Sequence, residues 1–133
     1  MRAEPAHLFV YGTLRKAASH SCHGLLASGA RLVGQARMQG RLYEIDGYPG
    51  AVPSSKAGEQ VAGELYRLLE PEAVLAALDD YEEAGKEYPA PQEYLRCRVT
   101  VTREDGTEVV AWCYLYNRPT AELQLISSGD WCR

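Results

Sequence analysis

The sequence lacks long apolar runs and any excess of positive charge. No uninterrupted apolar stretch approaches the roughly 20 residues of a membrane-spanning helix. The opening residues, MRAEPAH, hold an acid and a proline where an export signal has an apolar core. Lysine and arginine number 14 against 18 aspartate and glutamate, a net charge of −4, which gives no strong attraction to phosphate backbones or anionic lipids. We therefore expect a cytoplasmic protein with neither nucleic acid nor a membrane among its partners.

Paired metal-ligand spacing is also lacking. The four cysteines and three histidines are scattered singly: Cys22, Cys97, Cys113, Cys132, His7, His20 and His23. None shows the spacing of a zinc site. The even number of cysteines leaves two disulfides open, but a chain of 133 residues builds a core without them, so we interpret them as reduced thiols. The histidines are interpreted as surface residues, and the sequence predicts no metal and no cofactor.

Alternation of apolar and polar residues predicts the strands. The densest signal is a hairpin with strands at 95–101 and 109–115, joined by the turn residues Asp105 and Gly106. Four further strands are expected earlier in the chain, at 7–11, 31–38, 40–45 and 60–68. The glycines and proline of 47–50 predict a turn.

Two helices are expected among these strands, at about 19–27 and at 71–83. The second begins with Pro71 and has an apolar stripe that includes Val74 and Leu75. About six strands with two helices predict an α+β fold. We expect one domain over residues 1–133, built around a strongly curved sheet or barrel.

The end of the second helix is unusually acidic, reading DDYEE over residues 79–83. Acids are unfavourable there, because the helix dipole is negative at its C-terminus. At 100° per residue Glu82 lies about 20° from Leu75, on the buried stripe, whereas Asp80 is about 140° away. Apolar surroundings and neighbouring acids are expected to raise the pKa of Glu82, as a general base and acid requires. The alternative is an acidic helix end in solvent, and Asp79 is a weaker candidate for the same role.

A second candidate is the glycine turn after the first strand. If that strand stops at Tyr11, the backbone N–H groups of Gly12, Thr13 and Leu14 have no ladder partners. Consecutive amides of this kind form a concavity for an anion such as a carboxylate, to which Arg15 adds charge. The alternative is an ordinary strand-to-glycine turn.

Together the two features resemble the gamma-glutamylcyclotransferase-like family. The resemblance rests on FVYGTLR at residues 9–15, followed about 65 residues later by LDxYE at 78–82. Four supporting strings extend it over most of the chain: GYPG at 47–50, GELY at 63–66, AWCYLY at 111–116 and ISSGDW at 126–131. The resemblance implies a small mixed β-barrel of about six strands, with two or so helices packed around it.

The resemblance also implies an activity, the conversion of a γ-glutamyl-amine or γ-glutamyl amino acid to 5-oxoproline and a free amine. The substrate's own α-amine attacks its γ-carbonyl, so the reaction needs no protein nucleophile, metal or cofactor. In the family, the backbone of the turn that matches Tyr11, Gly12, Thr13 and Leu14 holds the glutamyl group. Glu82 matches the glutamate that acts as general base and acid.

Other positions bear on the same reaction. The family's aromatic strand suggests that Tyr116 hydrogen-bonds Glu82. A glycine usually follows the family's glutamate, but here Glu83 stands in its place and the long segment 84–92 follows, so the loop beside the pocket is expected to differ. Ser128 and Asp130 are interpreted as anchoring the tail.

Two other function classes remain open on the sequence. One is a noncatalytic glutamyl-binding or protein-interaction module that keeps the same pocket. The other is a thiol hydrolase, which would need a Cys–His pair that no motif supplies.

Overall fold

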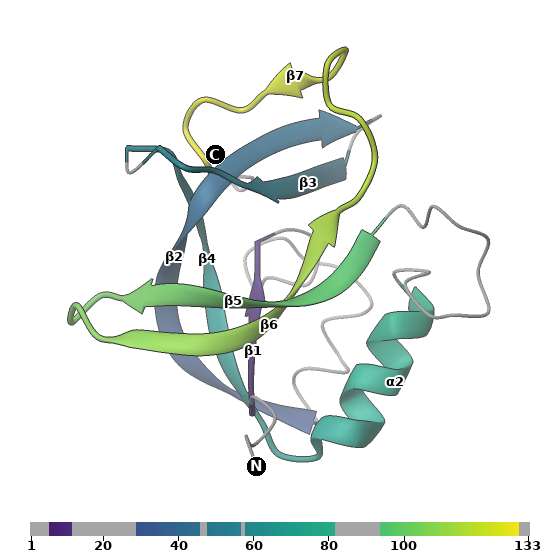
Figure 1. Ribbon diagram of the computed structural model, residues 1–133. Coiled ribbons are helices and arrows are strands. Elements are labelled where there is room, and N and C mark those ends of the chain that lie inside the picture. The colour runs from purple at the N-terminus through teal and green to yellow at the C-terminus, as the bar shows by residue number, and fades with distance from the viewer. Residues whose placement is uncertain (1–5, 12–28, 46–47, 57, 82–93, 131–133) are drawn as a thin grey trace.

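The computed structural model describes residues 6–11, 29–45, 48–56, 58–81 and 94–130 (Figure 1). These residues form seven strands and the helix α2. The strands are β1 (His7–Val10), β2 (Ala30–Ile45), β3 (Tyr48–Pro53), β4 (Gln60–Leu68), β5 (Tyr94–Arg103), β6 (Glu108–Tyr116) and β7 (Gln124–Leu125), and α2 spans Pro71–Tyr81. The helix predicted at 19–27 lies outside the described residues.

Five of the strands close into a barrel. From β2 the order runs through β4, β1, β6 and β5, and β5 pairs back to β2. The sheet is mixed, because β1 pairs in parallel with β6 while its other neighbour, β4, is antiparallel. β3 and β7 both pair with the second half of β2, outside this closed ring (Figure 1). The predicted α+β fold around a small mixed barrel is confirmed.

The predicted hairpin is confirmed as β5 and β6. Its turn is held by Asp105, whose carboxylate accepts a 3.0 Å hydrogen bond from the Thr107 backbone N–H. The register sets Cys97 opposite Cys113. Both of these cysteines carry thiols, as expected. Alternation along β6 then sends Cys113 into the barrel and Tyr114 to the outer face.

Two predicted strands, 31–38 and 40–45, are instead the single 16-residue strand β2. The prediction left residue 39 between the two strands and began the second at Gly40, whereas both residues lie inside β2. Here the glycine allows β3 to approach closely: a Cβ at residue 40 would lie 2.6 Å from the Val52 carbonyl oxygen. The irregularity in β2 falls earlier, where its register with β4 shifts between Leu32 and Gly34.

The turn predicted at 47–50 is wrong for its last three residues, which begin β3. Pro49 pairs with Glu44 of β2, and Gly50 pairs with Tyr43. A proline is tolerated here because β3 is an edge strand, whose outer side needs no N–H donor. Residue 47 lies outside the described part of the chain.

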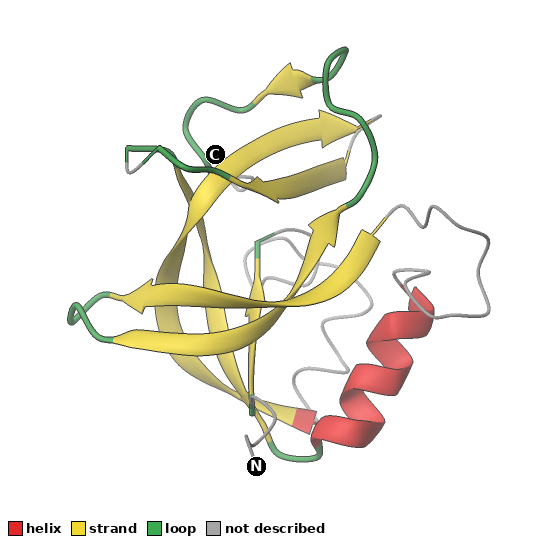
Figure 2. Ribbon diagram, viewed as in Figure 1, coloured by secondary structure: helices red, strands yellow, loops and turns green. Residues whose placement is uncertain are grey.

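Two apolar clusters hold the fold together. One fills the barrel, and its largest members are Phe9, Tyr11, Met38, Leu42, Val61, Leu65, Val101, Cys113 and Leu115. The other lies between the outer face of the barrel and α2, and contains Leu8, Val10, Ala30, Tyr66, Leu68, Val74, Leu75, Tyr94 and Tyr114. Figure 2 shows α2 along one side of the barrel.

The helix agrees with its predicted start and buried face. It begins at Pro71, has Glu72 in its first turn, and buries Val74 and Leu75 against the strands. Among the described residues, no helix has the length and apolar character needed to cross a bilayer.

The close approach of β1 and β4 generates a test. A Cβ at Gly63 would lie 2.3 Å from the Val10 carbonyl oxygen and 2.6 Å from the Phe9 ring. Gly63→Ala should therefore lower the free energy of unfolding by about 1–3 kcal/mol, measured by urea denaturation. Gly58→Ala, where a Cβ meets nothing within 4 Å, is the matched control. Equal stabilities of the two variants would contradict this packing.

Candidate functional site

The predicted site residues fall into two groups. Tyr11 and Tyr116 are described, whereas residues 12–14 and 82 lie outside the described part of the chain. The structure does describe the elements that precede these residues in the sequence. β1, which comes before residues 12–14, ends at Val10, and α2, which comes before residue 82, ends at Tyr81. Side chains of β1 and α2 share the outer apolar cluster, so the barrel strand and the helix are fixed relative to each other.

Tyr11 ties three segments together. Its side chain is 6% exposed. Its hydroxyl donates to the Tyr114 carbonyl oxygen at 2.5 Å and accepts from the Ala51 N–H at 3.1 Å. The end of β1 is thereby fastened to β6 and β3. Because the hydroxyl's one proton is donated in this contact, the Tyr11 side chain has a structural role.

Tyr116 belongs to an aromatic pair at the end of the hairpin. Its ring meets Tyr94 edge to face, with centroids 5.8 Å apart at 72°. The Tyr94 hydroxyl donates to the Pro49 carbonyl oxygen at 2.6 Å. Tyr116 also packs against Gly50, where a Cβ would lie 2.9 Å from the tyrosine's own Cβ. The pair therefore joins the start of β5 to β3, while a bond from Tyr116 to Glu82 stays a prediction.

Sequence reasoning missed Glu64. Its side chain is 4% exposed, and it is the only acidic or basic residue buried among the residues that the structure describes. Its carboxylate accepts a 3.1 Å hydrogen bond from the Tyr66 hydroxyl. The signal in the sequence was an acid between Gly63 and Leu65 within the run VAGELY of β4. Burying a charge is costly, and such groups mark functional sites.

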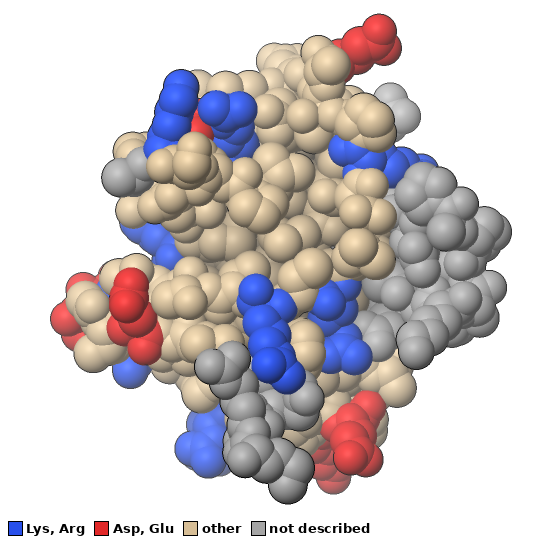
Figure 3. Space-filling view, viewed as in Figure 1, with Lys and Arg blue, Asp and Glu red and all other residues tan. Residues whose placement is uncertain are grey.

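The outer face of the hairpin carries a basic and aromatic cluster. The Arg96 and Arg98 guanidinium carbons lie 4.4 and 5.4 Å from the centroid of the Trp112 ring. The Trp112 Nε1 is buried without a hydrogen-bond partner in the described structure. Figure 3 shows Lys and Arg in several separate groups on this face of the molecule.

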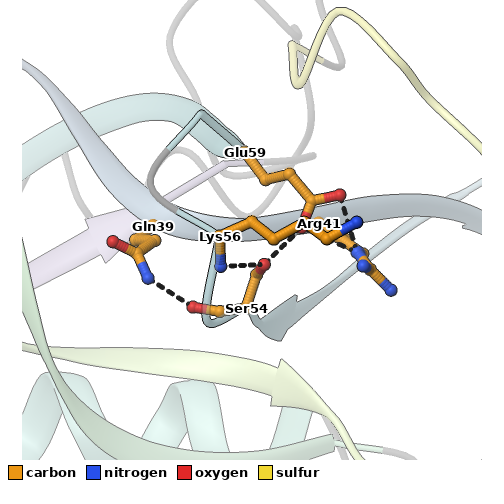
Figure 4. A network of polar contacts seen from close by, with 5 residues as sticks. All are labelled: Gln39, Arg41, Ser54, Lys56 and Glu59. Carbon is orange, nitrogen blue, oxygen red and sulfur yellow. Dashed lines mark hydrogen bonds and ion pairs between the residues drawn. The ribbon is translucent and has the colours of Figure 1, made fainter.

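A hollow of about 200 Å³ lies elsewhere, between β2, the start of β4 and the tail. Beside it is the polar network of Figure 4, in which the Arg41 Nε donates to both carboxylate oxygens of Glu59 at 2.8 Å. The Ser54 hydroxyl also donates to Glu59. The hydrogen bond from Ser54 lowers the pKa of the Glu59 carboxyl most, and the hydrogen bond from Arg41 lowers it further. The network fastens the segment before β4 to β2.

The tail lines one side of the same hollow. The Gly129 carbonyl accepts a 2.7 Å bond from the Ala62 N–H, and the Ile126 N–H donates to the Leu42 carbonyl at 2.7 Å. The Ser128 hydroxyl accepts from the Asp130 N–H at 3.2 Å. The tail is thus anchored through the backbone of Ile126 and Gly129, whereas the Ser128–Asp130 contact lies within the tail, so the anchoring role expected of these two residues stays a prediction.

The described cysteines and histidine do not favour thiol chemistry. Cys113 has no exposed surface, and burial raises the pKa of the Cys97 thiol, which disfavours the reactive thiolate. His7 is half-buried and so remains partly at the surface. Burial, and then the charges of Arg67 and Arg103, lower its pKa.

Comparison with known proteins identifies similar chains. Residues 8–133 match the family described as "Gamma-glutamyl cyclotransferase, AIG2-like". The gamma-glutamylcyclotransferase family protein YtfP of Escherichia coli is 38% identical over 125 residues, which cover 93% of this chain and 94% of YtfP.

Two solved structures are similar in fold. The crystal structure of YkqA from Bacillus subtilis has a TM-score of 0.70 at 30% identity, covering 96% of this chain and 40% of YkqA. That of an AIG2-like protein from Mus musculus has a TM-score of 0.72 at 25% identity, covering 97% and 89% of the two chains. The chain therefore spans most of YtfP and of the mouse protein, but less than half of YkqA.

The hydroxyl of Tyr11 provides a test of its structural role. Tyr11→Phe leaves a buried N–H at Ala51 and a carbonyl at Tyr114 without this partner, so the free energy of unfolding should fall by about 1–3 kcal/mol in chemical denaturation. Tyr43→Phe is the control. The Tyr43 hydroxyl bonds the solvent-exposed Arg41 guanidinium, and its loss should change stability by less than about 0.5 kcal/mol. A Tyr11→Phe variant as stable as this control would show that the hydroxyl does not fasten β1.

Proposed function

The chain belongs to the γ-glutamyl cyclotransferase, AIG2-like family, and on this premise we propose that it is itself a cyclotransferase. Its substrate is a γ-glutamyl-amine or γ-glutamyl amino acid, and its products are 5-oxoproline and a free amine. The observation that carries the proposal is the match over residues 8–133, which includes the YGTL string after β1 and Glu82 directly after α2. β1 and α2 both contribute side chains to the outer apolar cluster, and this supports a single site built from the two segments that follow them.

The reaction is an intramolecular acyl transfer. Glu82 takes a proton from the substrate's α-ammonium group, and the resulting amine attacks the γ-carbonyl carbon, forming the new C–N bond of the five-membered ring. The bond from that carbon to the leaving nitrogen then breaks, and the proton held by Glu82 passes to that nitrogen. The ring nitrogen loses its second proton as the amide forms, and the released amine takes one up and leaves as an ammonium ion. The glutamate ends the cycle as it began, and no metal or cofactor takes part.

The protein's main task in this mechanism is to hold the substrate folded on itself. The N–H groups of Gly12, Thr13 and Leu14 bind the glutamyl carboxylate, so that the amine and the γ-carbonyl remain close enough to react. The Tyr11 hydroxyl supports this arrangement, because it fixes the strand end from which that turn departs. Tyr116, braced by Tyr94, donates a hydrogen bond to Glu82.

An assay of product formation tests the activity. The protein is incubated with a panel of γ-glutamyl amines, γ-glutamyl dipeptides and glutathione, and 5-oxoproline is measured. At least one member should yield it. A protein that binds these compounds without forming 5-oxoproline would be the noncatalytic glutamyl-binding module instead.

Glu82→Gln tests the proposed base. The amide preserves shape but accepts no proton, so turnover of a confirmed substrate should fall by at least about 100-fold while the melting temperature is retained. Glu83→Gln is the matched control and should retain most of the activity. Similar rates for Glu82→Gln and the wild type would remove Glu82 from the mechanism.

Gly12→Val tests the amide turn. A side chain at this position either strains the turn or fills the space beside the bound carboxylate, so affinity for 5-oxoproline should fall by about tenfold or more. Melting temperature and product affinity are measured on the same variant. A folded Gly12→Val protein with unchanged affinity would place the glutamyl group elsewhere.

A further inference from the structure

Glu64 is a buried carboxylate to which the proposed mechanism gives no role. It lies near the middle of β4, in a strand whose residues from Gly63 to Tyr66 are all buried. A carboxylate removed from water loses several kcal/mol of solvation unless hydrogen-bond donors or a cation replace the water. The Tyr66 hydroxyl is one such donor, at 3.1 Å. A carboxylate accepts up to about four hydrogen bonds, so it can serve a protein donor and a ligand together.

The register places Glu64 beside the strand end from which the proposed glutamyl turn departs. Glu64 pairs with Val10, and paired residues point to the same face of a sheet. That face is the outer one, because Val10 and Tyr66 belong to the cluster that α2 covers. Gly12 follows Val10 by two residues, so chain geometry keeps their Cα atoms within about 7 Å of each other.

The chemistry of a γ-glutamyl group fits a carboxylate at this position. Its α-carboxylate and α-ammonium are attached to one carbon, so an ammonium group lies within a few Å of whatever holds the carboxylate. With the carboxylate on the amides of residues 12–14, the ammonium needs an anionic acceptor nearby. A protein carboxylate supplies charge-assisted hydrogen bonds to such a cation.

We propose that Glu64, positioned by the Tyr66 hydroxyl, binds the α-ammonium group of the γ-glutamyl substrate. This assignment rests on the proposed function, in which the substrate carries a γ-glutamyl group. Glu64 selects ligands with a charged α-amine, while Glu82 performs the proton transfer. The product loses this contact, because ring closure turns the α-nitrogen of 5-oxoproline into an uncharged amide. Glu64 therefore favours binding of the substrate over retention of the product.

Calorimetric titration of the full chain with two ligands tests the assignment. L-Glutamate γ-ethylamide carries the α-ammonium group, and 5-oxoproline lacks it; a Glu82→Gln background prevents turnover of the first. Adding Glu64→Gln should weaken ethylamide binding by about tenfold or more. It should change 5-oxoproline binding by less than about twofold. Equal losses for both ligands would mean that Glu64 only supports the fold, and no loss for either would remove it from the site.

Tyr66→Phe is the matched control. It removes the hydroxyl that positions Glu64 but keeps the carboxylate, so the preference for the ethylamide over 5-oxoproline should fall by clearly less than in Glu64→Gln. A Tyr66→Phe variant that loses this preference as fully as Glu64→Gln would overturn the assignment to the carboxylate. If Glu64→Gln does not fold, the wild type is titrated with the ethylamide in competition with its N-acetyl derivative, and no preference for the charged form overturns the proposal.

Failure of this inference differs from failure of the proposed function. A wild type that forms 5-oxoproline, with unchanged ligand discrimination in Glu64→Gln, overturns only the role of Glu64. A wild type that binds the ethylamide through Glu64 without forming 5-oxoproline overturns the cyclotransferase activity and keeps the ammonium site. A wild type that neither binds the ligands nor forms product overturns both.

Discussion

Barrel closure depends on the long strand β2. Its first two thirds pair with β4, its middle pairs with β5, and its last third pairs with β3 and β7. A strand that serves several partners must turn its hydrogen-bonding edges through a large angle, which needs strong twist and local irregularity. The register shift between Leu32 and Gly34 and the close approach at Gly40 are the features of β2 that meet this need. With the ring closed, β1 lies between β4 and β6.

In the closed barrel, the two faces of β1 make different contacts. Phe9, and Tyr11 just beyond the strand, turn into the barrel, where the tyrosine hydroxyl fixes the strand end to β3 and β6. Leu8 and Val10 turn outward to the surface shared with α2, beside Glu64. A rigid strand end next to a buried carboxylate is a suitable support for a small polar ligand, because little ordering remains to be done when the ligand binds.

The sequence predicted the elements in which local pattern and tertiary environment agree. Apolar and polar residues alternate along β5, Asp105 and Gly106 mark the turn to β6, and α2 has a proline at its start and an apolar stripe, so the positions of these elements follow from local pattern. The predictions failed at residue 39, where two expected strands are one, and at residues 48–50, where glycine and proline permit close strand packing and an edge position rather than a turn. Such roles depend on neighbours distant in sequence, which single-sequence patterns do not contain.

The residues of the candidate site also differ in how far the sequence alone could predict them. Residues 12–14 and 82 were identified by local rules and by family resemblance, and their roles stay predictions. Glu64 was not predicted as a buried residue. Alternation assigns a residue to one face of a strand but does not show whether a helix covers that face. Only the packing of α2 and the outer cluster makes this carboxylate a buried one.

The position of β1 also governs how the chain folds. A strand near the N-terminus pairs on one side with residues 64–67 and on the other with β6, which ends at residue 116. β1 can therefore pair with β4 once residues 64–67 have been made, but its other edge has no partner until β6 follows. Pairings over such separations carry a large loop-closure cost and slow the folding of β-rich domains. Barrel closure is consequently a late step of folding, and until β6 is in place one edge of β1 stays unpaired and prone to aggregation.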